Sequence, residues 1–407
     1  MKLPLSFGAL FLSVALLQLS SGAPAPLDAL SGLALGFATE QIGLLGSAHF
    51  FGFFIGCWWA PRLMGTVGHS RAFAAFTATG AIGLMAHMIF PDPLVWAALR
   101  IMSGLCVAGC YTVIEAWLNA ELTNATRGRT MGAYRVVDLG ASLMAQVIIG
   151  VLEPATYAAY NLLAILCCAA LFPLTLSKAT QPATPAAPRL RPGLAWRRSP
   201  LAVAGVMVAG LTAAAFRMVG PVYGEAVGLR TDQIGLFLAA YVLGGALAQY
   251  PVGWLADRRD RRHVLIGLSV AAMAGCAVTV AAAGMGTGAV MVAATVFGMT
   301  TFPIYSVSSA HAFDFAEGDE QVEISAALMF FYAIGAILSP LIAAALLARV
   351  GPGALFSFIA LGHLALVLFG LARMRARPSP AERVPYTYVP RTTYLVGRLL
   401  GFGRRRD

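Results

Sequence analysis

Long apolar segments separated by short loops run through most of the chain. Apolar residues follow one another without alternating with polar ones, which is typical of buried or lipid-facing helices and not of half-exposed strands. Each segment is close to the ~20 residues that a helix needs to cross the hydrocarbon core of a bilayer. The pattern predicts twelve spans, at residues 3–22, 42–61, 72–90, 94–116, 130–151, 155–177, 200–221, 233–254, 264–284, 287–310, 322–347 and 353–373.

The composition also indicates a membrane protein. Of the 407 residues, 59% are hydrophobic and 11% are charged, whereas a soluble domain carries about 25% charged residues. The six cysteines lie within apolar runs and have no zinc or redox spacing, so we interpret them as small buried hydrophobic residues. We therefore expect an all-α membrane protein with no metal site and no cofactor.

The second half of the chain repeats the first at an offset of 192 residues. The segment TEQIGL, which starts at Thr39, returns as TDQIGL, which starts at Thr231, and Gly52 falls on Gly244 in the same register. Paired repeats are typical of transporters in which two bundles face each other across a central site. The repeat predicts two pseudo-symmetric six-helix bundles.

Basic residues are distributed unequally between the two sides of the predicted spans. Twelve spans place both termini on one side, and that side collects nearly all the Lys and Arg of the loops and tail. Only Arg230 and Arg349 lie in loops on the opposite side. The positive-inside rule makes the basic side cytoplasmic. The net charge of +10 is thus explained by topology, with anionic lipid head groups as partners and no role in binding nucleic acid.

The first segment allows two interpretations. Lys2, the apolar run after it and the small residues of Ser21–Ala25 resemble a cleavable signal peptide. However, the segment 200–221 shifted back by 192 residues falls on 8–29, so the first segment has a partner in the second half. Cleavage would leave that partner unmatched, and we expect an uncleaved first helix.

The predicted domains are an N-terminal bundle at 1–177, a cytoplasmic linker at 178–199, a C-terminal bundle at 200–374 and a basic cytoplasmic tail at 375–407. The linker is rich in proline, so we expect it to be semi-flexible and without a packed helix. Prolines also break helicity in the tail, which either contacts lipid or is solvated. An acidic patch on the basic side could pair with a basic loop of the other half; it consists of Asp314, Glu317, Asp319, Glu320 and Glu323.

The loop between the eighth and ninth predicted spans carries the most specific motif, Gly253-Trp254-Leu255-Ala256-Asp257-Arg258-Arg259-Asp260-Arg261-Arg262. Gly253 allows two helices to approach closely, and Asp257 can interact with a helix N-terminus. Arg258, Arg261 and Arg262 hold the loop in the cytoplasm and can bind carboxylates when that side is shut. We interpret this loop as a cytoplasmic gate motif. The equivalent loop of the first half has Gly65 in place of the acidic residue.

This motif is similar to the G-x-L-x-D-R-x-x-R-R loop of the major facilitator superfamily. Arg100 and Gly104 resemble the R-x-x-x-G motif of that superfamily, which implies that Arg100 takes part in proton coupling. Pro61-Arg62-Leu63, together with Glu115-Ala116-Trp117-Leu118, resembles the poorly characterised YcaD-like bacterial branch. The resemblance implies the twelve-helix fold, a transport activity and a bacterial inner membrane location, but no substrate.

Ionisable residues inside the spans are candidates for coupling, because a charge in hydrocarbon is costly unless it is paired or hydrated. Arg100 and Glu115 are fifteen residues apart on one helix, about 22 Å, so they cannot pair directly. Arg135 and Asp138 share a helix face, and Glu115 is predicted at similar depth. We expect a Glu115–Arg135–Asp138 network to couple transport, unless it is a structural clamp or lies at the membrane boundary.

Four further residues are weaker candidates. Arg217 is predicted near the outer end of the seventh span, where it either faces an anion or anchors the helix. His311 and Asp314, three residues apart, form either a pH-sensitive gate or a helix cap. Tyr241 aligns with His49 in the repeat and either faces the cavity or packs in the core.

These observations predict a secondary active transporter that moves a small molecule by alternating access and acts as a monomer. No G-x-x-x-x-G-K-[ST] phosphate loop occurs, so a proton or ion gradient is the expected energy source. The alternative is an integral-membrane sensor or enzyme built on a transporter-like scaffold. An enzyme would need a polar cluster such as H-E-x-x-H within the spans, and the sequence has none.

Overall fold

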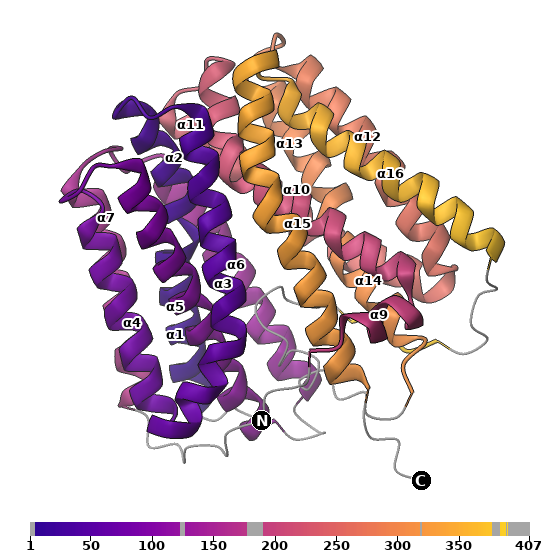
Figure 1. The fold of residues 1–407 in the computed structure, drawn as a ribbon, viewed down its shortest axis with the longest axis horizontal. Coiled ribbons are helices and arrows are strands. Elements are labelled where there is room, and N and C mark those ends of the chain that lie inside the picture. Colours follow the sequence, from indigo (N-terminus) through magenta and orange to yellow (C-terminus); the bar gives the residue numbers. More distant parts are fainter. Residues whose placement is uncertain are drawn as a thin grey trace.

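A computed structural model describes residues 5–122, 127–176, 190–317, 320–376, 383–387 and 389, and the described secondary structure is entirely helical (Figure 1). Most of the predicted linker and most of the predicted tail lie outside these ranges. The helices are α1 Leu5–Gly22, α2 Pro24–Ala34, α3 Thr39–Val67, α4 His69–Ala86, α5 Pro93–Glu121, α6 Arg127–Ile149, α7 Tyr157–Ala169, α8 Leu171–Thr175, α9 Pro192–Arg198, α10 Pro200–Ala226, α11 Thr231–Arg258, α12 Arg261–Ala282, α13 Thr287–Thr301, α14 Ile304–Phe313, α15 Gln321–Val350 and α16 Ala354–Ala376.

Every predicted span coincides with a helix or a pair of consecutive helices. Within the described ranges, eleven helical segments are long and apolar enough to cross a membrane. The predicted span at 72–90 is α4, whose first turn contains His69, Ser70 and Arg71 and is therefore less apolar than the rest. Because α4 packs against α5 and α7 inside the N-terminal bundle, it completes the predicted set of twelve. The chain is a multi-pass integral membrane protein.

The repeat is reproduced in the local structure. Gly36 and Gly228 both have positive φ, +77° and +84°, and each lies in the turn before a long helix. The side chain of Gln41 accepts a hydrogen bond from the backbone N–H of Ala38 at 2.8 Å, and Gln233 does the same for Arg230 at 3.0 Å. The repeated TEQIGL and TDQIGL segments are therefore helix starts that satisfy an otherwise unpaired backbone donor in the same way.

Glycines at equivalent positions set the helix crossings of both halves. A Cβ atom added at Gly52 of α3 would overlap the carbonyl oxygen of Ile101 in α5. A Cβ atom at Gly244 of α11 would overlap the carbonyl oxygen of Thr295 in α13. Small residues permit this close backbone contact in a membrane, where packing replaces the hydrophobic effect as the driving force between helices.

The first span is longer than predicted. We expected it to end at residue 22, but the chain bends at Ala23 and continues as α2 to Ala34, for a total of 28 residues from Phe7. Pro24 does not stop the helix because a proline at the first helical position loses no intrahelical hydrogen bond. Ala25, part of the segment with cleavage-site character, is buried in α2, which packs against α10.

The prediction that the linker contains no packed helix is wrong for its last part. Pro192 starts the short helix α9, which buries Leu194 and Ala195 and packs against α15. Arg198 at its end binds Glu317 and Glu320 at 2.6 and 2.9 Å. Glu317 and Glu320 of the acidic patch therefore pair with the linker, whereas we expected a basic loop of the other half as the partner. Asp319 lies outside the described residues.

The two halves meet along α3 and α15 and along α6 and α11. Figure 1 shows them in contact where α3 begins and diverging toward the end where α3 ends. We call the end at which the halves diverge the motif end, because residues 253–262 lie there. The end at which the halves are in contact is the opposite end. At the opposite end the contact is close: a Cβ atom at Gly43 would lie 2.7 Å from the carbonyl oxygen of Pro340, and one at Gly235 would lie 2.8 Å from the carbonyl oxygen of Gln146.

Candidate functional site

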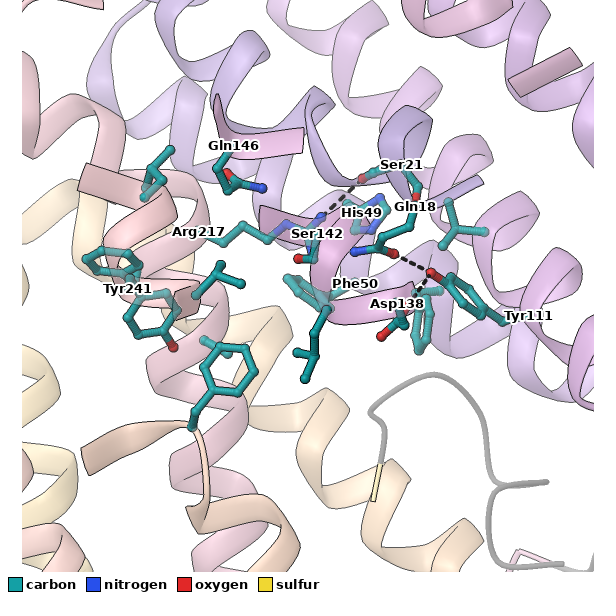
Figure 2. Close-up of a pocket in the computed structure, with 18 of the residues that line it drawn as sticks. Gln18, Ser21, His49, Phe50, Tyr111, Asp138, Ser142, Gln146, Arg217 and Tyr241 are labelled. Atoms are coloured by element: carbon teal, nitrogen blue, oxygen red, sulfur yellow. Dashed lines mark hydrogen bonds between the residues drawn. The ribbon is translucent and has the colours of Figure 1, made fainter. Parts of the chain in front are cut away.

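A cavity of about 180 Å³ lies between the two halves and is lined by both. Figure 2 shows its polar side chains gathered on the N-terminal half. The lining residues of the N-terminal half are Gln18, Ser21, His49, Phe50, Phe53, Val107, Tyr111, Asp138, Leu139, Ser142 and Gln146. Those of the C-terminal half are Ala213, Phe216, Arg217, Leu238, Tyr241, Val242, Phe302 and Tyr332. The two walls thus differ in chemistry, one mainly polar and one mainly aromatic.

Asp138 is the carboxylate of this cavity. The hydroxyl of Tyr111, from α5, lies 3.2 Å from its Oδ1 and also hydrogen-bonds Oε1 of Gln18, from α1. These three side chains come from three helices, so they tie the polar wall together (Figure 2). Asp138 was a predicted coupling residue, and the structure places it in the cavity wall. The roles predicted for Glu115, which is fully buried, and for Arg135 remain predictions.

Arg217 of α10 crosses from the C-terminal half to the N-terminal half. Its Nη2 donates to the carbonyl oxygens of Ser21 and Gly22 at 3.1 and 3.2 Å. The carbonyl of Gly22 lies at the end of α1 and has no helical partner, because Pro26, four residues on, lacks an N–H group. The negative end of a helix attracts a cation. The break between α1 and α2 therefore leaves carbonyl oxygens that bind and position Arg217. The sequence had predicted only that Arg217 lies near the outer end of a span.

The aromatic wall is continuous. The rings of Phe216 and Tyr241 have centroids 4.3 Å apart, and the rings of Tyr241 and Phe302 have centroids 5.4 Å apart. Tyr241, which we weighed between cavity and core, contributes to both, since it lines the cavity with an exposed fraction of 7%. Planar apolar groups pack well against such a wall.

Arg100 lies behind the cavity in a fully buried polar cluster. Its Nε is 3.3 Å from Oδ2 of Asp28, a carboxylate in α2 that also lies 3.6 Å from Nε2 of His87. The hydroxyl of Tyr160 donates to Oδ1 of Asp28 at 2.9 Å. The side chains of Asp28 and Arg100 are 0% and 3% exposed, so each buried charge is stabilised by the opposite charge of the other. Arg100 is thus paired with Asp28 of α2.

Sequence reasoning missed Asp28, because we ended the first span at residue 22. The repeat contained the signal that would have found it. Helix α10 ends at Ala226, and subtracting the offset of 192 gives Ala34, the end of α2. A span extended to Ala34 would have made Asp28 an intramembrane charge and therefore a candidate partner for Arg100.

The gate motif forms a second polar site at the motif end. Arg261 is 1% exposed and donates to Oδ1 of Asp314 at 2.6 Å, to Oδ1 of Asp257 at 3.2 Å and to the carbonyl oxygen of Ala310 at 3.0 Å. The carboxylate of Asp314 therefore faces Arg261, while the ring of His311 packs against Phe315 with centroids 5.2 Å apart. The two alternatives for His311 and Asp314, a pH-sensitive gate or a helix cap, both remain predictions.

The remaining arginines of the motif hold its loop. The guanidinium of Arg258 lies 4.1 Å from the ring centre of Trp254. Arg262 binds Asp260 at 2.6 Å, and Asp260 caps α12 by accepting from the backbone N–H of Arg262. Burial acts to raise the pKa of Asp260, but the hydrogen bonds from Arg262 and its charge outweigh burial and lower that pKa to about 2. The carboxylate of Asp260 is therefore ionised throughout the physiological pH range.

Comparisons with known proteins agree on one family. A sequence model of the Major Facilitator Superfamily matches residues 202–397. The chain is 27% identical over 347 residues to an uncharacterized MFS-type transporter of Enterobacter sp. (strain 638), covering 84% of this chain and 89% of that protein. It is 25% identical to the uncharacterized MFS-type transporter YcaD of Salmonella arizonae, covering 85% and 90%.

Solved structures share the fold. The nucleoside transporter NupG superposes with a TM-score of 0.75 at 14% identity, covering 92% of this chain and 100% of that one. A bacterial homolog of the human lysosomal transporter Spinster, in an inward-facing and unoccupied conformation, superposes with a TM-score of 0.68 at 12% identity, covering 99% and 98%. The family model, the relatives and the motif at residues 253–262 agree: this chain resembles the transporters of the major facilitator superfamily, and among them the YcaD-type proteins.

Proposed function

We propose that this protein is a secondary active transporter that moves a small molecule by alternating access. The observation that carries the proposal is the cavity shared by two pseudo-symmetric halves. The halves are packed at the opposite end and diverge at the motif end (Figure 1). With the motif end in the cytoplasm, this arrangement is an inward-facing state, and rocking of the halves around the cavity would produce the outward-facing one.

The two walls of the cavity suggest the chemistry of the substrate. Both hydrogen bonds of Arg217 to the carbonyls of α1 use Nη2, and a guanidinium has further donors on Nη1 and Nε. The aromatic wall beside it favours a planar or apolar group. We propose a small amphipathic molecule whose carboxylate or other acceptor group binds Arg217 and whose apolar part packs against Phe216 and Tyr241.

Uptake into proteoliposomes tests this proposal. The panel contains small carboxylic acids with aromatic or aliphatic bodies, together with neutral nucleosides, each measured with and without an imposed pH gradient. If none of these molecules is transported but one of them binds, the result would favour the alternative of a membrane sensor. Acceleration of uptake by a pH gradient, abolished by an ionophore, would support proton coupling.

Replacing Arg217 by glutamine is expected to weaken binding of the transported acid about tenfold or more, because a hydrogen bond to a charged group contributes about 1.5–3 kcal/mol. Uptake at varied substrate concentration gives the half-saturation constant. Arg230→Gln is the matched control, since Arg230 is exposed and pairs only with Asp232 two residues on, within the described part of the chain. Equal half-saturation constants in Arg217→Gln and the parent would exclude Arg217 as the anion site.

Both termini are expected in the cytoplasm. The even number of predicted spans and the concentration of Lys and Arg on one side motivate this prediction. Reporter fusions after Lys178, in the linker, and after Arg391, in the tail, should both report the cytoplasm. A periplasmic signal from either fusion contradicts the orientation.

A further inference from the structure

A segment of the tail is bound to the C-terminal half at the motif end. We call residues 383–387 and 389 the strap. The backbone N–H of Val384 donates to Oδ1 of Asp314 at 3.0 Å, and its carbonyl accepts from Arg261. The backbone N–H of Tyr386, two residues on, donates to Oδ1 of Asp257 at 2.6 Å. Val384 and Tyr386 thus bind charged side chains of the gate motif and of Asp314 beside it, and hydrogen bonds to charged groups are the stronger kind.

The surface under the strap is shaped for it. The hydroxyl of Tyr386 donates to Oε1 of Gln249 at 3.1 Å. A Cβ atom at Gly253 would lie 2.6 Å from the ring of Tyr386. The backbone N–H of Val389 donates to Oγ of Ser306 at 3.1 Å, and Val389 is 2% exposed. Gly253 therefore leaves room for the tyrosine ring, and the buried valine secures the far end of the strap.

The strap covers the face of α11 that meets the N-terminal half. At the opposite end, Gly235 of α11 touches α6 at Gln146. From Gly235 to Gly253 is eighteen residues, or five turns of 3.6 residues, so both glycines lie on one face of the helix. Val242, between them, lines the cavity. The face of α11 that packs on α6 at one end is thus occupied by Tyr386 at the other.

We propose that the strap is an intramolecular wedge that binds the C-terminal half and keeps the motif end open. This inference rests on the proposed alternating access. Closing the motif end would bring α6 toward the part of α11 that Tyr386 covers, and it would require Asp257 and Arg261 to face the N-terminal half. While the strap is bound, Asp257 and Arg261 are hydrogen-bonded to its backbone, and Tyr386 covers the surface of α11. The strap must leave before the halves can close.

Distances between spin labels in nanodiscs test the wedge. In a protein whose exposed Cys168 is replaced by serine, cysteines are introduced at Gly132 of α6 and Gly267 of α12, where a Cβ atom meets no other atom within 4 Å. A second pair, at Val151 and Gly288, reports on the opposite end. A stop codon after Ala376 removes the strap, and a stop codon after Pro390 is the matched control that keeps the strap and removes the rest of the tail.

The protein shortened after Ala376 should gain a population with a short distance at the motif end. We expect the ratio of closed to open molecules to rise about tenfold, which corresponds to about 1.4 kcal/mol. The protein shortened after Pro390 should match the full chain, and a peptide of the sequence RVPYTYV added to the shorter protein should restore the long distance. Tyr386→Ala should shift the ratio in the same direction as the deletion.

Four outcomes distinguish the wedge from a purely structural role of the strap and from a failure of alternating access. An unchanged distance distribution after removal of the strap overturns the wedge, and a lower thermal stability with unchanged distances assigns the strap a structural role only. Uptake of substrate by that same protein would leave the transporter proposal intact. A shortened distance at the motif end without lengthening at the opposite end would support the wedge and contradict alternating access.

Discussion

Replacing Arg100 by methionine is expected to destabilise the protein by about 3–5 kcal/mol, because removing one partner of a buried ion pair leaves the other charge uncompensated. The substitution leaves Asp28 buried without the cation that lies 3.3 Å from it. The hydrogen bond from Tyr160 and the imidazole of His87 at 3.6 Å remain, but neither supplies the permanent positive charge of the guanidinium. The midpoint of thermal unfolding in detergent should fall accordingly.

A double substitution shows whether the pair is responsible. Asp28→Asn combined with Arg100→Met removes both charges, and this protein should be more stable than the one with Arg100→Met alone. Arg71→Met, at a position exposed near the start of α4, is the control and should leave the midpoint unchanged. If the double variant is no more stable than Arg100→Met alone, the pairing of these charges does not explain the loss.

The sequence predicted the fold because the same physical constraint acts along the whole chain. Every span must be long and apolar, so composition alone locates it. The 192-residue offset then predicted two pseudo-symmetric bundles, and the matching positive φ angles of Gly36 and Gly228 agree with that symmetry. The boundary near Pro24 was misplaced because proline marks both the end of a helix and the first turn of the next one.

The candidate site was only partly predictable. Asp138 and Arg217 are conspicuous because a charge inside a span is rare. Gln18 and Ser142 are neutral, and such residues occur on many helix faces, so only the packing of the helices shows that they line the cavity. The strap could not have been predicted, because it binds Asp257 and Asp314 through backbone N–H groups that every residue except proline has.

Replacing Asp138 by asparagine is expected to abolish accumulation of substrate driven by a proton gradient while leaving exchange of substrate across the membrane. Asparagine has nearly the same shape and can keep the contact with Tyr111, but it cannot take up and release a proton at physiological pH. The accumulation ratio under an inward proton gradient should therefore fall toward one. Proteoliposomes loaded with labelled substrate should still exchange it for external substrate at a rate similar to that of the parent.

Two variants make this test specific to the proton. Asp138→Glu keeps a titratable carboxylate and should retain part of the accumulation. Ser142→Ala, one helical turn further along α6 in the same wall, should lower accumulation and exchange together, because it affects substrate binding and not protonation. If Asp138→Asn folds and still accumulates substrate against its gradient, the proton is carried elsewhere. The Asp28–Arg100 pair is then the next group to test, because Asp28 is also a buried carboxylate within a span.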